Sequence, residues 1–182
     1  MPSQVRLRAV IVIVAGVAGS GKTTIGAQLA DRLGWRFADG DSFHPPANVA
    51  KMHAGIPLTD EDRAPWLRVI SAWMDALIGA GQSGVLTCSA LRRAYRDELL
   101  SGRPAARMVF LNVSRDELVR RLDTRLGHFF PEGLLDSQLK VLEPPAPDEH
   151  VLTIPADGEA AQTVAEIMRR LSLPGAPAQG DA

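Results

Sequence analysis

Apolar and polar positions along this chain follow two periods, one typical of buried strands and one typical of amphipathic helices. The run over 10–14 is β-branched throughout, which predicts a strand buried on both faces. Ile25 and Leu29 then begin a four-residue repeat that predicts a helix over 22–33. Further strands are expected over 35–38, 85–88, 108–113 and 151–154, and further helices over 47–53, 59–78, 93–100, 114–126, 134–142 and 159–171. This alternation predicts an α/β fold in three layers, a parallel sheet with helices on both faces and ligands at the carboxyl ends of the strands.

Two of the expected helices begin with capping signals. Thr59 with Asp62, and Ser114 with Glu117, have the three-residue spacing of an N-terminal capping box. Both boxes are expected to form.

The chain is expected to fold as a single domain over 1–172. Its 182 residues, 46% of them apolar, can bury one sizeable core, and no linker divides them. The last stretch, 173–182, lacks periodicity and is rich in Pro, Gly and Ala, which predicts a disordered tail.

Between the first strand and the first helix lies a segment that fits the phosphate-loop pattern GxxxxGK[ST] at every fixed position. In such a loop, backbone N–H groups curl around phosphate oxygens and the helix N-terminus adds partial positive charge. Lys22 is expected to reach the β- and γ-phosphates, and the Thr23 hydroxyl to ligate Mg²⁺. The motif predicts an ATP-type site formed by Gly16, Val17, Ala18, Gly19, Ser20, Gly21, Lys22, Thr23 and Thr24. A chance match is the alternative, and the flanking strand and helix weigh against it.

Composition narrows the range of partners. With 20 Lys and Arg against 21 Asp and Glu, the formal net charge is −1 without a basic block, so neither nucleic acid nor an anionic membrane is expected as a partner. Cys88 is the only cysteine, which excludes an internal disulfide and fits a reducing compartment. No apolar stretch approaches the roughly 18 residues of a membrane span. We therefore expect a soluble, cytoplasmic protein.

Two carboxylates follow the second predicted strand in the sequence Asp39-Gly40-Asp41. Because residues i and i+2 of an extended segment point the same way, both are expected to face the phosphate loop. One carboxylate can orient the water shell of a metal while the other accepts the proton of an attacking hydroxyl. A turn in which both only cap backbone groups is the alternative. The neighbouring phosphate loop favours the catalytic interpretation.

The remaining sequence discriminates among classes of phosphate-loop protein. Switch GTPases are associated with an Asn-Lys-x-Asp element, but neither Asn48 nor Asn112 precedes a lysine. Large ATPases usually end an apolar strand in an aspartate, whereas the third strand here ends in Cys88-Ser89-Ala90. A small-molecule kinase is the class that remains.

Four further segments closely resemble the bacterial-type gluconate kinase (gluconokinase) family. They are 41–52, 55–67, 88–97 and 127–130, and they occur in the family's order, so that the resemblance extends from the phosphate loop to about Leu142. The resemblance implies phosphorylation of D-gluconate at its 6-hydroxyl by ATP, with Mg²⁺. It also implies a P-loop NTPase fold like that of nucleoside-monophosphate and shikimate kinases, a lid around 121–135, and a homodimer.

The resemblance also selects candidates for the acceptor site. They are Asp41, His44, Lys51, Arg63, Ser89, Arg92, Arg96 and His128. It assigns the proton-accepting role to Asp41 and the metal-shell role to Asp39. Gluconate, a polyol with one carboxylate, needs a cation and several hydrogen-bonding groups, so these cations outnumber the charge to be matched. Some of these cations must therefore have other roles, and Arg63 could simply pair with the acids before it.

Arg121 and Arg125 stand four residues apart, on one helix face that leads towards His128. Both are expected to bind the nucleotide, and Arg125 is expected to join Lys22 in neutralising charge on the transferring phosphoryl group. A solvated face on which Glu117 pairs with Arg121 is the alternative. Arg125 is therefore the favoured catalytic arginine.

Two rival functions remain at this point. A shikimate kinase also has two carboxylates after its second strand, but its Gly-Gly-Gly segment after the third strand is here Ser89-Ala90-Leu91. A regulatory module that hydrolyses ATP slowly would need no acceptor. Stimulation of ATP consumption by one polyol acid separates the kinase from such a module.

Overall fold

The computed structural model describes residues 9–126 and 134–176, and within these ranges five strands form one parallel sheet. The strands are β1 (Ile11–Ala15), β2 (Arg36–Asp39), β3 (Gly84–Cys88), β4 (Ala106–Asn112) and β5 (Val151–Pro155). The helices are α1 (Lys22–Leu33), α2 (Pro46–His53), α3 (Asp60–Gly79), α4 (Arg93–Leu100), α5 (Arg115–Leu126), α6 (Leu134–Val141) and α7 (Ala160–Arg170), with a short 3₁₀ helix η1 (Gly40–Phe43). The strand order is β2-β3-β1-β4-β5, and each neighbouring pair is parallel.

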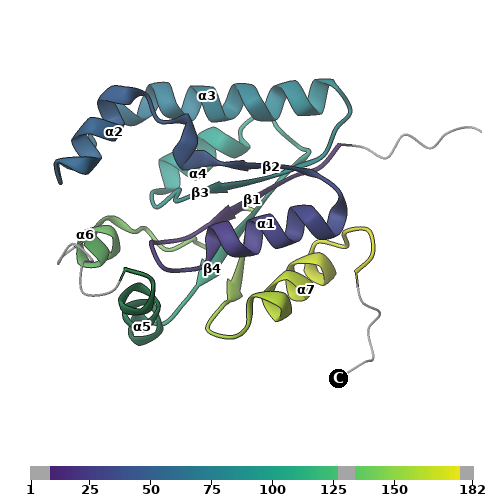
Figure 1. Ribbon diagram of the computed structural model, residues 1–182. Coiled ribbons are helices and arrows are strands. Elements are labelled where there is room, and N and C mark those ends of the chain that lie inside the picture. Colours follow the sequence, from purple (N-terminus) through teal and green to yellow (C-terminus); the bar gives the residue numbers. More distant parts are fainter. Residues whose placement is uncertain (1–8, 127–133, 177–182) are drawn as a thin grey trace, which may run out of the picture.

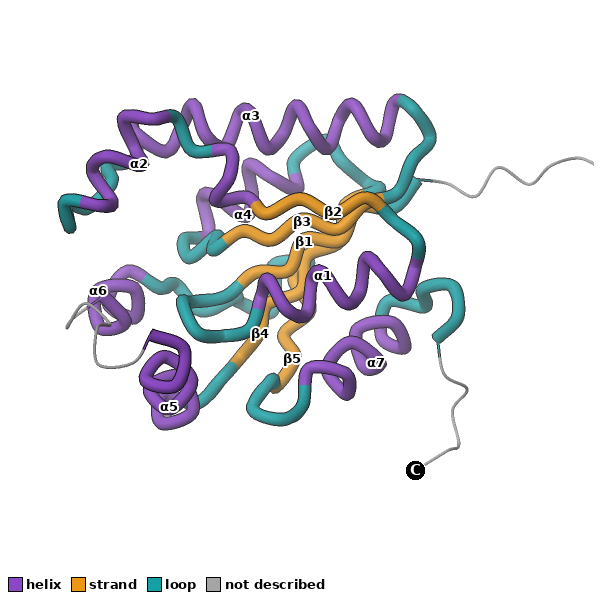
Figure 2. The backbone as a smooth tube through the Cα atoms, in the orientation of Figure 1, coloured by secondary structure: helices purple, strands orange, loops and turns teal. Residues whose placement is uncertain are grey.

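The sheet is the middle of three layers, as predicted. Helices α1 and α7 cover one face, while α3 and α4 cover the other (Figures 1 and 2). The carboxyl ends of the strands point towards the side where α2, α5 and α6 lie (Figure 1). The first helix has the predicted bounds, because its apolar period and its glycine neighbours at both ends leave little ambiguity.

Strand β1 is central because its alternate side chains enter two different cores. Ile11, Ile13 and Ala15 pack with the apolar residues of α3 and α4. Val12 and Val14 pack with those of α1 and α7. All five side chains are fully buried, as the unbroken β-branched run predicted.

One of the two predicted capping boxes forms and the other does not. Thr59 and Asp62 exchange both bonds at the start of α3, with donor–acceptor distances of 3.0 and 3.2 Å. At the start of α5, Asp157 Oδ1 instead accepts from the backbone N–H and the hydroxyl of Ser114, at 2.9 and 2.6 Å. Glu117 turns towards two arginines of its own helix. The box predicted at Ser114 was wrong because a loop distant in sequence supplies the cap.

The folded part of the chain extends past the predicted boundary at residue 172. Leu173 is 6% exposed and packs in the core shared by α1 and α7, beside Ile167 and Met168. Its backbone N–H donates to the Met168 carbonyl oxygen at 2.9 Å. The last turn after α7 therefore belongs to the domain, while 177–182 lie outside the described residues.

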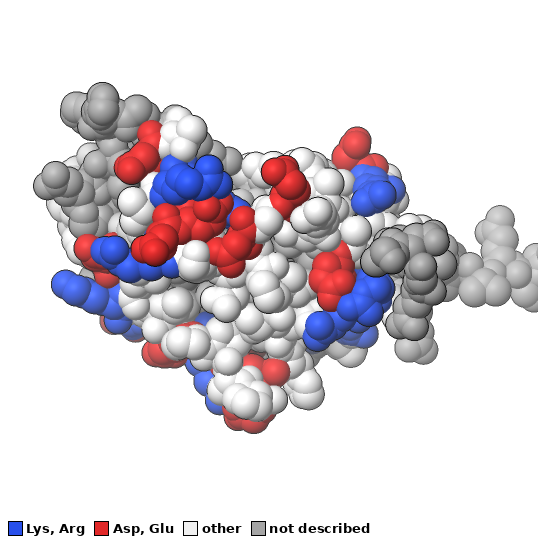
Figure 3. Space-filling model, turned by 90° about the horizontal axis from the view of Figure 1, so that it is seen from below, with Lys and Arg blue, Asp and Glu red and all other residues white. Residues whose placement is uncertain are grey.

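Charges of both signs are interspersed on the face seen in Figure 3. Within the described residues, ion pairs one helical turn apart include Glu117 with Arg120 and Glu166 with Arg169, both at 2.6 Å. Such pairs neutralise each other locally. In the two described ranges, no helix combines the length and apolar character that crossing a bilayer would require.

Arg96 of α4 is enclosed by the fold. Its side chain is 0% exposed, and its partner Glu149 is 2% exposed. Arg96 Nε and Nη2 donate to the two carboxylate oxygens of Glu149 at 2.6 and 2.9 Å. Its Nη1 donates to the carbonyl oxygens of Ala90 and Leu91 at 3.1 and 3.2 Å. The expectation that Arg96 binds substrate is therefore corrected, because its guanidinium is buried and each of its three nitrogens already donates within the protein.

The bonds from Arg96 hold an unusual turn after β3. Ala90 has a φ of 43°, in the left-handed region that disfavours residues with a side chain. The two carbonyl oxygens that Arg96 binds belong to this residue and the next one. Arg96 thus fixes from inside the segment that leads to Arg92.

We expect Arg96→Met to lower the free energy of unfolding by about 3–5 kcal/mol, because it leaves the Glu149 carboxylate buried without its partner. Urea denaturation measures this loss. The hydrogen bonds from Arg96 are the main cause that lowers the pKa of Glu149 below its ordinary 4.5. The pair therefore contributes fully to the free energy of unfolding above pH 4.5. This contribution should be lost as the pH falls through the lowered pKa of Glu149.

Arg92→Met is the control, since the pair of Arg92 with Asp60 is exposed, at 39% and 62%. Its loss of stability should stay below about 1 kcal/mol. Equal losses in the two variants would contradict the structural role of Arg96.

Candidate active site

The phosphate loop runs from the end of β1 to the start of α1 in a conformation that depends on glycine. Gly16 has a φ of 150°, and an ideal Cβ there would lie 2.7 Å from the Ser20 hydroxyl. Gly21, with a φ of 93°, is the N-cap of α1 and supplies no side-chain cap to the first N–H groups of the helix. Lys22 Nζ donates to the Val17 carbonyl oxygen at 2.8 Å, which lays the ammonium across the loop. This arrangement suits a bound phosphate.

A small apolar cluster supports the loop from behind. Val17 packs with Leu122 of α5 and Leu135 of α6. Gln138 of α6 also accepts a hydrogen bond from the Ala18 backbone N–H at 2.7 Å. The two helices nearest to the predicted lid are therefore in direct contact with the loop.

The carboxylate pair meets the phosphate loop at Asp39. Thr23 Oγ1 donates to Asp39 Oδ2 at 3.2 Å, and the Asp41 backbone N–H donates to Asp39 Oδ1 at 3.1 Å. The two side chains predicted to serve Mg²⁺ thus lie together, and both present oxygen, the donor that this ion prefers. Over the described residues there is no group of three or more His, Cys, Asp or Glu side chains that could hold a metal ion. The two oxygen ligands of Thr23 and Asp39 fit an ion that keeps most of its ligands as water and phosphate.

Gly40 sets the position of both carboxylates. An ideal Cβ on Gly40 would lie 2.2 Å from the Thr87 carbonyl oxygen of β3, so only glycine allows this approach. Trp66 Nε1 donates to the Gly40 carbonyl oxygen at 2.7 Å and ties the same residue to α3. Asp39 ends β2, while Asp41 lies in the first turn of η1. The orientation of Asp41 predicted from strand alternation was wrong, because the chain leaves the extended conformation at Gly40.

His44 follows η1 and lies within electrostatic reach of two charged candidates. Its ring stacks on Trp66, with centroids 4.3 Å apart and planes 11° from parallel. Burial is the main cause that lowers the pKa of His44 below its ordinary 6.5. The charge of Arg63 acts in the same direction, and that of Asp41 opposes it. Burial and the charge of Arg63 therefore favour the neutral imidazole.

Arg63 and Arg92 gather around one tyrosine. The guanidinium of Arg63 lies over the Tyr95 ring, 5.7 Å from its centroid. The Tyr95 hydroxyl donates to Asp60, and Arg92 Nη1 donates to the two oxygens of the same carboxylate at 3.0 and 3.1 Å. Within 9–126 and 134–176, no ion pair forms between Arg63 and the acids before it, so that alternative is not what the structure shows. Two cations from α3 and from the start of α4 therefore lie near each other.

Lys51 and Ser89 have partners within the protein. Lys51 Nζ donates to both oxygens of Asp62, at 2.7 and 2.8 Å, and so ties α2 to the start of α3. This bond is the main cause that lowers the pKa of Asp62. The Ser89 carbonyl oxygen accepts from the Gly16 backbone N–H at 3.4 Å. A contact of either side chain with substrate stays a prediction.

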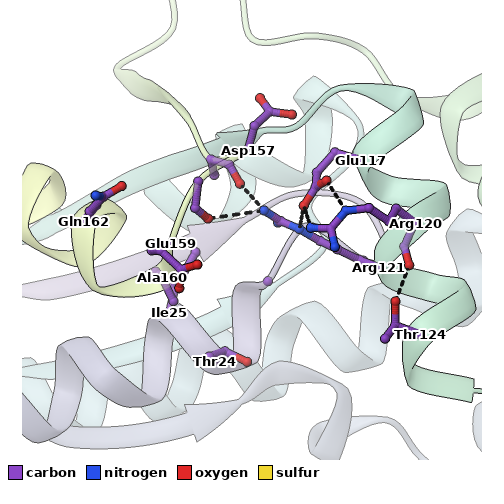
Figure 4. A pocket seen from close by; sticks show the side chains of 14 residues that line it. Thr24, Ile25, Glu117, Arg120, Arg121, Thr124, Asp157, Glu159, Ala160 and Gln162 are labelled. Carbon is purple, nitrogen blue, oxygen red and sulfur yellow. Dashed lines mark hydrogen bonds and ion pairs between the residues drawn. The ribbon is translucent and has the colours of Figure 1, made fainter.

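A cavity of about 530 Å³ opens beside the phosphate loop, between α1, α5 and the loop after β5. Figure 4 shows the guanidinium of Arg121 between Glu117 and this loop. Arg121 Nε donates to Glu117 at 2.6 Å, Nη2 to the Ala156 carbonyl oxygen at 2.7 Å, and Nη1 to the Ser20 carbonyl oxygen at 3.3 Å. Hydrogen bonds from Arg120 and Arg121 lower the pKa of Glu117 to about 2. The predicted pairing of Glu117 with Arg121 is present, and the same arginine also lines the cavity.

Part of the predicted lid lies outside the described residues. This is the case for 127–133, which include His128, and for the side chain of Arg125, whose backbone belongs to α5. The expected roles of these two residues stay predictions.

No role was predicted for Asn48, Asp60 or Tyr95. Asn48 bonds to His44, while Asp60 and Tyr95 contact the two arginines. All three lie within the segments 41–52, 55–67 and 88–97, in which the predicted site residues are mainly cations. Membership of those segments was the available signal.

The fold and the loop together define the class of the protein as a P-loop kinase of small molecules. The shikimate kinase family model matches residues 18–171. A gluconokinase of Gluconobacter oxydans (strain 621H) is 46% identical over 167 residues, covering 92% of this chain and 94% of that protein. The chain belongs to the gluconokinase family, as its motifs indicated.

Solved structures agree with this assignment. A sugar kinase from Janibacter sp. HTCC2649 superposes with a TM-score of 0.84 at 44% identity, over 94% of this chain and 99% of that one. A gluconokinase from Sinorhizobium meliloti 1021 superposes with a TM-score of 0.81 at 40% identity, over 92% of this chain and 93% of that one.

We expect Gly40→Ala to lower both stability and activity, because the added Cβ would collide with the Thr87 carbonyl oxygen in the middle of the sheet. An overpacked site of this kind typically costs about 1–3 kcal/mol, and the turn that carries Asp39 and Asp41 would have to move. Urea denaturation and steady-state kinetics measure the two effects.

Gly79→Ala is the matched control, since no atom lies within 4 Å of the Cβ position there. Its stability should be equal to that of the unaltered protein or slightly higher. If Gly40→Ala behaved in the same way, the close approach to β3 would not constrain the carboxylates.

Proposed function

We propose that this protein transfers the γ-phosphoryl group of ATP to the 6-hydroxyl of D-gluconate, forming 6-phospho-D-gluconate and ADP. The main structural support for this proposal is the contact between Thr23 and Asp39. It joins the phosphate loop to the turn that leads to the proposed acceptor-side residues. Relatives named gluconokinase support gluconate as the acceptor. The absence of a Gly-Gly-Gly segment at 89–91 argues against shikimate.

ATP would bind with its phosphates in the loop and its nucleoside in the neighbouring cavity. That cavity has about 530 Å³, within the range of small-molecule sites. Backbone N–H groups at the start of α1 would bind the phosphate oxygens, and Lys22 would place its charge on the β- and γ-phosphates. Arg121 would contact the nucleotide from α5, and Arg125 would neutralise charge that develops during transfer.

Thr23 and Asp39 would hold Mg²⁺, Thr23 directly and Asp39 through water. Bound there, the ion would neutralise negative charge on the β- and γ-phosphate oxygens. The contribution of the chain is to keep the two oxygen ligands close to each other, as their 3.2 Å contact does.

Asp41 would act as the general base. It accepts the proton of the 6-hydroxyl while that oxygen forms a bond to the γ-phosphorus. The bond between the γ-phosphorus and the bridging oxygen breaks, and its electron pair leaves with ADP. Along the described chain, the carboxylate of Asp41 has no hydrogen-bonded partner, so it is available for this role.

The acceptor would be recognised by a carboxylate clamp and several neutral contacts. Arg63 and Arg92 would bind the gluconate carboxylate, with Arg92 exchanging its exposed pair with Asp60 for the substrate. The polyol oxygens would be contacted by His44, Lys51, Ser89 and His128.

We also propose that the protein works as a homodimer in the cytoplasm. The family resemblance supports the dimer. Burial raises the pKa of the Cys88 thiol to about 12, which keeps the only cysteine protonated and inert in the folded protein.

Acceptor-dependent release of ADP tests the proposed function. The purified protein is assayed with Mg-ATP and, separately, gluconate, shikimate, related sugar acids and nucleoside monophosphates. Of these acceptors, only gluconate should raise the rate of ADP release steeply. ADP release that does not depend on any acceptor would instead indicate a regulatory ATPase, and preference for shikimate would refute the assignment.

We expect Asp41→Asn to lower kcat by about 10² or more while ATP affinity stays similar, because the amide keeps the shape of the side chain but cannot accept the proton. Steady-state kinetics and nucleotide titration measure the two quantities. Asp39→Asn should respond differently, with a loss that excess Mg²⁺ partly restores. Equal, mild effects at both positions would mean that the pair only caps the turn.

We expect glucose to fall at least about ten- to hundred-fold below gluconate in kcat/KM, because a neutral sugar leaves an arginine of the clamp unpaired. Competing-substrate kinetics measure the ratio. Arg92→Met should narrow this gap, chiefly by weakening gluconate. Comparable phosphorylation of both compounds by the unaltered protein would exclude the clamp.

A further inference from the structure

The ring of His44 is held in one plane by its contact with Trp66. The two rings are 4.3 Å apart and 11° from parallel. Trp66 is itself fixed, since it is 2% exposed and its Nε1 donates to the Gly40 carbonyl oxygen at 2.7 Å. One face of the imidazole is therefore covered, and polar contacts are confined to its edge.

Asn48 determines what one edge of that ring can do. Its side chain is buried, at 3% exposure, and its Nδ2 lies 2.8 Å from the Asp62 carbonyl oxygen. A backbone carbonyl only accepts hydrogen bonds, so the amide nitrogen must be the atom that faces Asp62. The same Nδ2 lies 3.2 Å from Nδ1 of His44.

The two hydrogens on Nδ2 of Asn48 determine which nitrogen of the His44 imidazole carries hydrogen. Nδ2 of Asn48 has two hydrogens, one for Asp62 and one for His44, and a nitrogen that receives a hydrogen bond carries no hydrogen itself. His44 must accept at Nδ1, and in the neutral ring its hydrogen is then on Nε2. Burial and the charge of Arg63 both favour the neutral ring, although Asp41 opposes them.

We propose that Asn48 is a positioning residue that fixes His44 as the Nε2–H tautomer, so that His44 donates a hydrogen bond to an oxygen of the acceptor substrate. The identification of that acceptor as gluconate rests on the proposed function. Throughout the described ranges, Nε2 of His44 has no hydrogen-bonded partner within the protein, so it is available for this donation.

The charged groups around His44 support this assignment. Asp41 lies on η1 and Arg63 on α3, and both act on the ring electrostatically. Lys51 and Asp62 form an ion pair at 2.7 Å on the other side of Asn48. A neutral N–H donor complements the arginines, because it can recognise a hydroxyl without attracting a second carboxylate.

The tautomer is measured directly, without substrate, by ¹H–¹⁵N NMR of protein labelled with ¹⁵N-histidine at pH 7.5. His44→Gln identifies the signals of His44 among those of the 4 histidines. We expect hydrogen on Nε2 in the unaltered protein and a mixture of tautomers in Asn48→Ala. Hydrogen on Nδ1 in the unaltered protein would overturn the proposal.

Lys51→Met is the matched control for Asn48→Ala. It removes the neighbouring tie between α2 and α3 but leaves the bond between Asn48 and His44. The Nε2–H tautomer should persist in it. Equal mixing of tautomers in both variants would show that Asn48 acts only by attaching α2, which contradicts the proposal.

Kinetics of two His44 variants test the donation to substrate and do not depend on whether Asn48→Ala folds. The amide nitrogen of glutamine can replace Nε2, whereas that of asparagine lies closer to the position of Nδ1. We therefore expect His44→Gln to retain at least about tenfold more kcat/KM for gluconate than His44→Asn, with the KM for ATP unchanged in both. Equal losses, or the reverse order, would overturn the donation to the acceptor.

The two proposals fail in distinguishable ways. If gluconate is not phosphorylated but the NMR signals show hydrogen on Nε2, the proposed function fails and the role of Asn48 is supported. If gluconate is phosphorylated and hydrogen is found on Nδ1, the role of Asn48 is refuted and the proposed function is unaffected.

Discussion

The pairing of β1 with β3 on one side and β4 on the other is the constraint on which the site depends. The register sets Ala15 opposite Cys88, so the phosphate loop and the turn after β3 begin side by side. The hydrogen bond from the Gly16 N–H to the Ser89 carbonyl oxygen continues this pairing past the strands. Because β1 is covered on both faces, the sheet cannot shift without disturbing two cores. The position of the loop is therefore inherited from the packing of the whole domain.

A second set of contacts organises the proposed acceptor side around β3 and α3. Gly40 lies against the β3 backbone and receives a hydrogen bond from Trp66, and Trp66 in turn supports the ring of His44. One buried tryptophan thus contacts both the carboxylate turn and the imidazole of His44. Its helical spacing predicted a core residue, which is correct, but spacing alone does not show which polar groups such a residue orients.

Much of the fold could be predicted because the signals were local. The bounds of α1 and the capping box at Thr59 depend on residues a few positions apart, and both predictions are confirmed. Two of the predictions that failed involve partners that are distant in sequence. Glu149 is 53 residues from Arg96, and Asp157 is 43 residues from Ser114.

For the site, the motif located the loop and the carboxylate pair, and Thr23 does lie against Asp39. The motif could not predict the side-chain hydrogen bonds of His44, because they depend on how α2 packs against α3. The roles of Lys22, Asp41 and Arg125 in catalysis remain predictions, as does the lid.

The buried pair of Arg96 and Glu149 has a consequence for how this sequence can diverge. A change at either position alone leaves an isolated charge in the interior, whereas replacing both with apolar residues of similar volume can be close to neutral. The two positions are therefore strongly non-additive. Between related chains they should be exchanged together, so that a lineage crosses from the ionic to the apolar arrangement only through a poorly folding intermediate or a simultaneous double change.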